Sequence, residues 1–121
     1  MRYVSLALLL LLLTIAPAAA KKPAPLRVAD LIGCYEAPPG DDNFNLMRFD
    51  GAGRFFYLDT SIGKPVQYRY RLQGRELTIL YGQGGDRPQH ITAIDQDGIR
   101  FAAGDVWKRI ACQRFTDHIR R

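Results

Sequence analysis

The residues that could take part in catalysis are few and lie far apart in this chain. After the apolar N-terminal segment the sequence has one serine, Ser61, and two histidines, His90 and His118. Nucleophilic hydrolysis needs a serine whose proton is accepted by a histidine, which an acidic residue orients in turn. No histidine is close to Ser61 in the sequence, so such a site would depend on the fold alone. We therefore predict that the protein is not an enzyme.

Three short motifs share part of the pattern of an ion or phosphate site. Asp95-Gln96-Asp97-Gly98 begins like a calcium loop, but it lacks the third acidic position and the distant Glu, and it is typical of a hairpin turn. Gly82-Gln83-Gly84-Gly85 is rich in glycine but is not followed by a helix, which a phosphate-binding loop requires. His90 and Asp86 supply only two candidate metal ligands. We expect neither a metal nor a cofactor.

The remaining reactive side chains are two cysteines, Cys34 and Cys112, near the two ends of the expected folded body. Two cysteines of one exported chain usually pair, although buried thiols or one reactive thiol are alternatives. A reactive thiol would call for a neighbouring histidine and a helix start, and the sequence shows neither beside these residues. We predict a disulfide, which would stabilise the fold by about 4–5 kcal/mol on the chain-entropy model.

The first twenty residues predict export. Arg2 is followed by the apolar segment Val4–Ile15, and Ala18–Ala20 then precedes Lys21. This order of charge, apolar run and small residues is that of a secretory signal peptide at residues 1–20. The apolar run is shorter than the ~20 residues that cross a bilayer as a helix, and an uncleaved anchor is the alternative. We expect a periplasmic or secreted protein.

Removal of residues 1–20 leaves about a hundred residues, enough for one small domain. The remaining residues 21–121 have 16 basic and 12 acidic side chains and a net charge of +4. A charge of this size usually keeps a small domain in solution. Outside the cytosol it would meet anionic lipid, lipopolysaccharide or acidic polymers. We expect a monomer with no nucleic-acid partner and at most peripheral contact with an anionic membrane or polymer.

The elements that would position these residues are short strands. A leader at residues 21–32 includes one helical turn, and a tail at residues 113–121 either frays, packs on the body or docks on a membrane. Between them the sequence alternates with a period of two, with turn residues about every ten positions. The eight expected strands are Gly33–Glu36, Asn45–Phe49, Arg54–Asp59, Val66–Gln73, Glu76–Tyr81, His90–Ile94, Ile99–Ala102 and Val106–Cys112.

Most connections are short enough to require antiparallel hairpins. Eight consecutive hairpin strands form a meander with two exposed edges, and closure into a barrel removes both edges. The first and last strands then become neighbours, which brings Cys34 beside Cys112. A Greek-key order would not generally do so. We therefore predict an all-β, single eight-stranded antiparallel meander barrel over residues 33–112, with a disulfide across its seam.

The period of two also predicts which side chains share a face. If Cys34 and Cys112 face one side, then Tyr35, Trp107 and Arg109 face the other. A guanidinium beside aromatic rings could close one end of the barrel through cation–π stacking.

Gly33-Cys34-Tyr35 and Arg109 resemble a pattern of the lipocalin-like, or calycin-type, small barrels. In that family the first strand carries Gly-x-Trp after a helical turn, and an Arg of the last strand packs across the Trp. Tyr35 stands at the aromatic position here, and the resemblance covers roughly residues 31–112. It implies an eight-stranded barrel and often a small apolar ligand inside, and it carries no shared catalytic residues.

The expected interior is aromatic, and in a barrel of this size side chains alone can fill it. A filled core and a ligand cavity ringed by tyrosines are the two alternatives. The residues expected inside are Tyr35, Phe55, Tyr57, Tyr68, Tyr70, Leu72, Leu77, Ile79 and Phe101. The candidate ligand-binding residues are Tyr35, Tyr57, Tyr68, Tyr70, Trp107 and Arg109.

Two kinds of binding protein are compatible with these features. One carries a small apolar or amphipathic ligand in the barrel. The other binds a protein, as an inhibitor or immunity-type module acting on an envelope enzyme, through the loops Pro38–Asn43 and Gly82–Gln89. An empty connected cavity would favour the carrier, and a filled barrel with an apolar patch at one rim would favour the protein binder.

Overall fold

A computed structural model of the chain describes residues 24–37, 45–82 and 84–120. The expected signal peptide and the loop Pro38–Asn43 lie outside these residues. No helix within them is long and apolar enough to cross a membrane.

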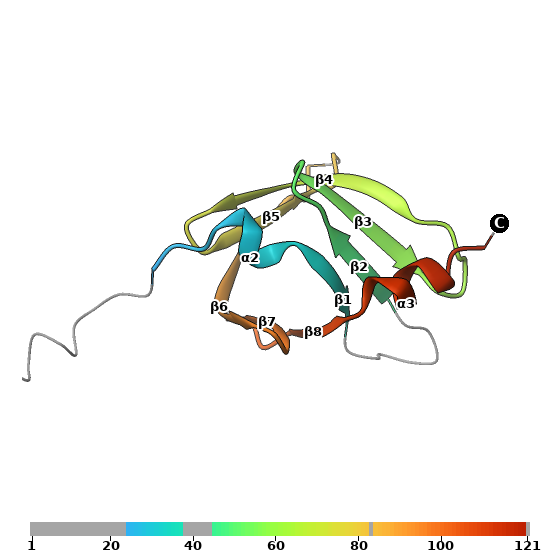
Figure 1. Ribbon diagram of the computed structural model, residues 1–121. Coiled ribbons are helices and arrows are strands. Elements are labelled where there is room, and N and C mark those ends of the chain that lie inside the picture. Colours follow the sequence, from blue (N-terminus) through green and yellow to red (C-terminus); the bar gives the residue numbers. More distant parts are fainter. Residues whose placement is uncertain (1–23, 38–44, 83, 121) are drawn as a thin grey trace, which may run out of the picture.

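Eight antiparallel strands form a closed barrel in which neighbours follow the order of the sequence (Figure 1). β1 pairs with both β2 and β8, so the predicted closure of the meander is confirmed. The described residues also form two short helices, one before the first strand and one after the last. The elements are α2 (Val28–Leu31), β1 (Gly33–Glu36), β2 (Asn45–Phe49), β3 (Arg54–Asp59), β4 (Val66–Gln73), β5 (Glu76–Leu80), β6 (Gln89–Asp95), β7 (Gly98–Phe101), β8 (Val106–Ile110) and α3 (Cys112–Asp117).

The last strand is shorter than the sequence predicts. β8 pairs with β1 as far as Ile110, which lies opposite Cys34, and Cys112 is the first residue of α3 rather than the end of a strand. β1 begins at Gly33, one residue before Cys34. If β8 continued beyond Ile110, its added residues would therefore soon have no β1 residue to pair with. The chain turns at Ala111 instead, and this turn returns Cys112 to the outer surface of β1.

The barrel interior is one hydrophobic cluster, in agreement with the predicted aromatic filling. Buried members are Leu31, Tyr35, Met47, Phe49, Phe55, Tyr70, Leu77, Ile79, Ile91, Ile99 and Phe101. Tyr57, Tyr68, Leu72 and Trp107 are partly buried against them. Because side chains alternate along each strand, a second set of apolar residues on β1–β3 faces outward.

α3 covers this second set from outside the barrel. Its Phe115 is 3% exposed and packs with Cys34, Leu46 and Leu58. Arg114 of α3 donates hydrogen bonds to both carboxylate oxygens of Glu36 in β1, at 3.2 and 2.7 Å. Figure 1 shows α3 lying alongside the barrel wall, away from α2. The segment after β8 is therefore part of the folded body.

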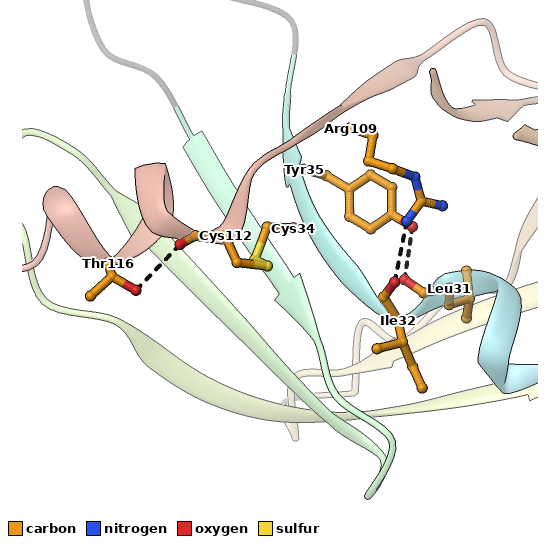
Figure 2. The surroundings of a disulfide bond; sticks show 7 residues. All are labelled: Leu31, Ile32, Cys34, Tyr35, Arg109, Cys112 and Thr116. Atoms are coloured by element: carbon orange, nitrogen blue, oxygen red, sulfur yellow. Dashed lines mark hydrogen bonds between the residues drawn. A yellow bond between two sulfur atoms is a disulfide. The ribbon is translucent and has the colours of Figure 1, made fainter. Parts of the chain in front are cut away.

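Cys34 and Cys112 form the predicted disulfide, with 5.2 Å between their Cα atoms. The bond joins β1 to the start of α3, next to the pairing of β1 with β8 (Figure 2). It closes a segment with a sequence separation of 78 residues. It therefore fastens both the barrel seam and the helix that packs outside it.

Replacement of both cysteines by serine should lower the free energy of unfolding by about 2–5 kcal/mol, because the unfolded chain loses its constraint. Urea unfolding followed by circular dichroism measures this difference. The oxidised wild type and the same protein with a reductant should differ by a similar amount. Equal midpoints for the oxidised wild type and the double variant would contradict a stabilising role for the bond.

Candidate functional site

The end of the barrel next to α2 is closed by Tyr35 and Arg109. Tyr35, on β1, is fully buried, and its hydroxyl donates a hydrogen bond of 2.7 Å to the carbonyl of Leu31 in α2. The guanidinium of Arg109, on β8, lies 4.9 Å from the centre of the Tyr35 ring (Figure 2). Register places the two residues directly opposite each other. The predicted cation–π contact between Tyr35 and Arg109 is confirmed.

Arg109 also holds the chain segments around this end. Its Nη1 and Nη2 donate to the carbonyls of Ile32 and Asp30, both at 3.2 Å, and its Nε donates to the carbonyl of Asp95 at 3.3 Å. The first two carbonyls belong to the C-terminal end of α2, which carries unsatisfied acceptors and partial negative charge. A cation at this position therefore fixes α2 across the barrel end.

Gly33 gives Arg109 the space for this contact. A Cβ atom at position 33 would lie 2.9 Å from Nη1 of Arg109, and the φ of 140° at Gly33 is rarely adopted by residues with a side chain. The Gly-x-aromatic pattern thus has a physical reason here. We name Gly33, Tyr35 and Arg109 with α2 the closed end.

An open hollow of about 340 Å³ lies beside the closed end, lined by Asp30, Ile94, Asp95, Gln96 and Arg109. The two carboxylates already accept hydrogen bonds of 2.8 Å from backbone N–H groups of Arg27 and Asp97. The Arg109 guanidinium is directed to carbonyls, and the lining has no histidine, serine or thiol. The hollow therefore brings together no catalytic group.

Trp107 lies in the barrel interior rather than at the closed end, contrary to the expected aromatic pair with Tyr35. Its ring centre is 4.8 Å from Phe101, 6.2 Å from Phe49 and 6.4 Å from Phe55. Phe49 in turn contacts Tyr35 edge-on at 5.7 Å, so Phe49 links the two residues. Aromatic rings thus occupy the middle of the barrel.

Tyr70 has a structural partner within the protein. It is 8% exposed, and its hydroxyl donates a hydrogen bond of 2.7 Å to the carbonyl of Asp50 in the turn between β2 and β3. Burial raises its pKa. With the hydroxyl engaged, Tyr70 anchors this turn.

The opposite end of the barrel carries three tyrosines that stay partly accessible. Tyr57 on β3 lies opposite Val66 on β4, Tyr68 follows on the same face of β4, and Tyr81 comes directly after β5. The rings of Tyr68 and Tyr81 meet edge-on at 4.9 Å. Tyr81 is 48% exposed and Val66 is 46% exposed. We name Tyr57, Val66, Tyr68 and Tyr81 the tyrosine rim.

The hydroxyls of the tyrosine rim differ from those of Tyr35 and Tyr70 in their hydrogen bonding. No residue in the described part of the chain forms a hydrogen bond with the hydroxyl of Tyr57, Tyr68 or Tyr81, although Tyr35 and Tyr70 both have such a bond. Burial raises the pKa of Tyr57 and of Tyr81, and the nearby Tyr68 adds to both shifts. Among the described residues, the rim therefore offers phenol hydroxyls with no hydrogen-bond partner beside apolar side chains. Tyr81 was missed at the sequence level because it falls at the end of its strand.

The residues considered for catalysis are dispersed. Ser61 donates a hydrogen bond of 2.6 Å to Asp59 within a turn. His90 contacts Glu76 at 2.7 Å on the surface, and Nδ1 of His118 lies 2.8 Å from the carbonyl of Arg114. Among the described residues there is no group of three histidine, cysteine or acidic side chains placed to hold a metal ion. The structure therefore brings none of Ser61, His90 and His118 together in one site.

No family model, curated protein or solved structure matches the chain. The resemblance to lipocalin-like barrels therefore depends on the closed eight-stranded meander and on the residues of the closed end.

Replacement of Tyr35 by phenylalanine tests the closed end. The loss of the hydrogen bond to Leu31 should cost about 1–3 kcal/mol at neutral pH, because a buried carbonyl loses its partner. Burial raises the pKa of Tyr35 to about 12, against the opposing charge of Arg109. The folded state therefore retains this proton when the unfolded state releases it, so wild-type stability should fall as pH rises from 10 to about 12.

Urea unfolding at a series of pH values measures both effects. Tyr35→Phe should show a shallower loss of stability over that alkaline range than wild type. Tyr81→Phe is the matched control, because its hydroxyl has no partner in the described residues and its neutral-pH stability should change little. Parallel pH profiles for wild type and Tyr35→Phe would contradict the assigned pKa.

Proposed function

We propose that the protein is an exported, non-catalytic binding module that recognises another protein through its tyrosine rim. The observation that carries this proposal is the rim itself, where three tyrosine hydroxyls form no hydrogen bond with any described residue and lie beside the exposed Val66. Tyrosine is common at the energetic centres of protein interfaces, since it offers a rigid apolar ring and a polar end. The rim can contact a partner without any rearrangement of the barrel.

The filled interior favours a protein partner over a ligand carried inside the barrel. Ring centres lie at contact distances across the middle, with Phe101 to Trp107 at 4.8 Å, Phe49 to Phe55 at 5.0 Å and Phe49 to Tyr70 at 5.1 Å. A ligand that entered the barrel would have to displace these rings from their packing. The second candidate function is recognition of a small amphipathic ligand lying on the rim, which the same unpaired hydroxyls favour.

Export and family are part of the proposal. The apolar leader followed by small residues supports export, and a disulfide persists best in an oxidising compartment such as the periplasm or the extracellular medium. The contact between Tyr35 and Arg109 supports a lipocalin-like barrel. The partner class that suits this location is an envelope or secreted protein, with an inhibitor or immunity-type role towards an envelope enzyme.

Photo-crosslinking tests the rim. A photo-reactive amino acid is placed at position 81 in one variant and at position 28 in another, and the crosslinked products are compared. Val28 is 41% exposed on α2, at the other end of the barrel, and serves as the matched control. We expect position 81, and not position 28, to crosslink to one partner in its native compartment. With that partner purified, Tyr81→Ala should weaken binding by roughly thirtyfold, the effect of about 2 kcal/mol at an interface centre, and Val28→Ala should not.

Equal affinity for wild type and Tyr81→Ala would contradict a role for the rim in protein binding. Native mass spectrometry of the protein from its own compartment covers the second candidate. A small molecule that accompanies wild type and is lost in Tyr57→Ala would replace the protein partner as the proposed occupant of the rim.

A further inference from the structure

Four arginines gather on the outer wall of the barrel, on three consecutive strands. Arg48 is on β2, Arg54 on β3, and Arg69 and Arg71 on β4. Each alternates with residues of the interior cluster, such as Met47, Phe55 and Tyr70, and all four are exposed. We name Arg48, Arg54, Arg69 and Arg71 the arginine face.

Strand register places these side chains beside one another. Arg54 lies directly opposite Arg69, and Arg71 is two positions further along the same face of β4. Arg48 lies opposite Phe56, and the guanidinium of Arg54 is 5.7 Å from the centre of the Phe56 ring. Nη2 of Arg69 lies 3.7 Å from the place a Cβ of Gly53 would take, so it reaches the turn that precedes Arg54. The four cations therefore form one continuous patch.

The described acidic side chains neutralise little of this patch. Arg54 forms an ion pair with Asp50, and no acidic side chain of the described residues pairs with Arg48, Arg69 or Arg71. Like charges directly opposite each other across two strands are destabilising. The exposed outer positions of these strands do not require arginine for packing, so the fold alone does not account for this concentration of charge.

We infer that the arginine face binds a linear polymer that carries phosphate groups. Arginine presents a planar fork of donors that matches the oxygens of a phosphate, and four such forks on adjacent strands fit successive phosphates of one chain. The arginine face curves with the barrel wall. A flexible polymer chain can follow this curvature, whereas a flat surface such as a membrane would contact only part of the arginine face. This surface is separate from the tyrosine rim and goes beyond the function proposed above.

A membrane is a weaker match than a polymer. Peripheral membrane binding combines basic residues with apolar side chains that insert at the interface. The large exposed apolar side chains of the described residues are Val28, Ile32, Ile62, Val66, Tyr81 and Val106, and none belongs to the outward positions of β2, β3 or β4 that form the arginine face.

The test uses fluorescent inorganic polyphosphate as the probe and the variant Arg69→Glu. Binding is measured by anisotropy over a series of salt concentrations. The affinity should fall at least about tenfold in the variant, since one contact is lost and a repulsive charge replaces it. The dependence of log K on log salt should also become shallower by roughly 0.7–1. The new carboxylate faces Arg54, so the melting temperature should stay the same or rise.

Arg100→Glu is the matched control. It makes the same change in net charge on β7, four strands away from β3 in the barrel order. We expect it to retain the wild-type affinity within about twofold, because Arg100 lies outside the arginine face. If the glutamate variant folds poorly, Arg69→Gln takes its place. It removes the charge without reversing it and should also lower the affinity for polyphosphate.

Three results would overturn the inference. One is no measurable binding of polyphosphate at low salt. Another is an equal loss of affinity in Arg69→Glu and Arg100→Glu, which would indicate net charge alone. The third is tighter binding to phosphatidylglycerol vesicles than to polyphosphate, which would point to a membrane. Because Arg69→Glu leaves the tyrosine rim intact, its binding to the protein partner should not change, so the two proposals can fail separately.

Discussion

The pairing of β1 with β8 is the constraint on which the rest of the structure depends. The eight short strands have no free edge because β1 pairs with β8, and Tyr35 lies opposite Arg109 in the middle of this seam. The same two residues then perform a second task, since Arg109 stacks on Tyr35 and binds the carbonyls at the end of α2. The disulfide of Cys34 fastens the seam from the outer side of β1, so adjacent residues secure both faces of one strand.

Closure at the seam determines which surfaces of the described barrel stay accessible. A small closed barrel leaves an interior that aromatic rings fill, and here Trp107 lies among Phe49, Phe55 and Phe101. One end is sealed by α2 and Arg109, and part of the outer wall is covered by α3 through Phe115. The tyrosine rim at the end opposite α2 and the arginine face on β2–β4 keep exposed side chains, and we propose both as recognition surfaces. Both are chemically distinctive, and they lie on different parts of the barrel.

The period of two and the turn residues were sufficient to predict the strands and their hairpin order, because each hairpin is a local feature. The disulfide was predicted from the two cysteines of an exported chain and from closure of the barrel. The end of β8 was not predictable in this way, since it depends on where β1 begins as its partner. Leu46 and Met47 are both apolar, and alternation alone cannot say which faces inward. The structure supplies the answer through Phe115, which covers Leu46 from outside. The arginine face likewise depends on register, which brings Arg54 opposite Arg69.

Native-state hydrogen exchange tests the central role of the seam most directly. If the β1–β8 pairing holds the barrel together, its backbone amides should exchange only through global unfolding, with the same free energy that urea unfolding gives. The hairpin of β4 and β5 is the internal reference, because it can persist as a local unit. Protection of the β1 and β8 amides at the global value supports the account. Exchange of these amides through a low-energy opening, while β4 and β5 remain protected, would contradict it.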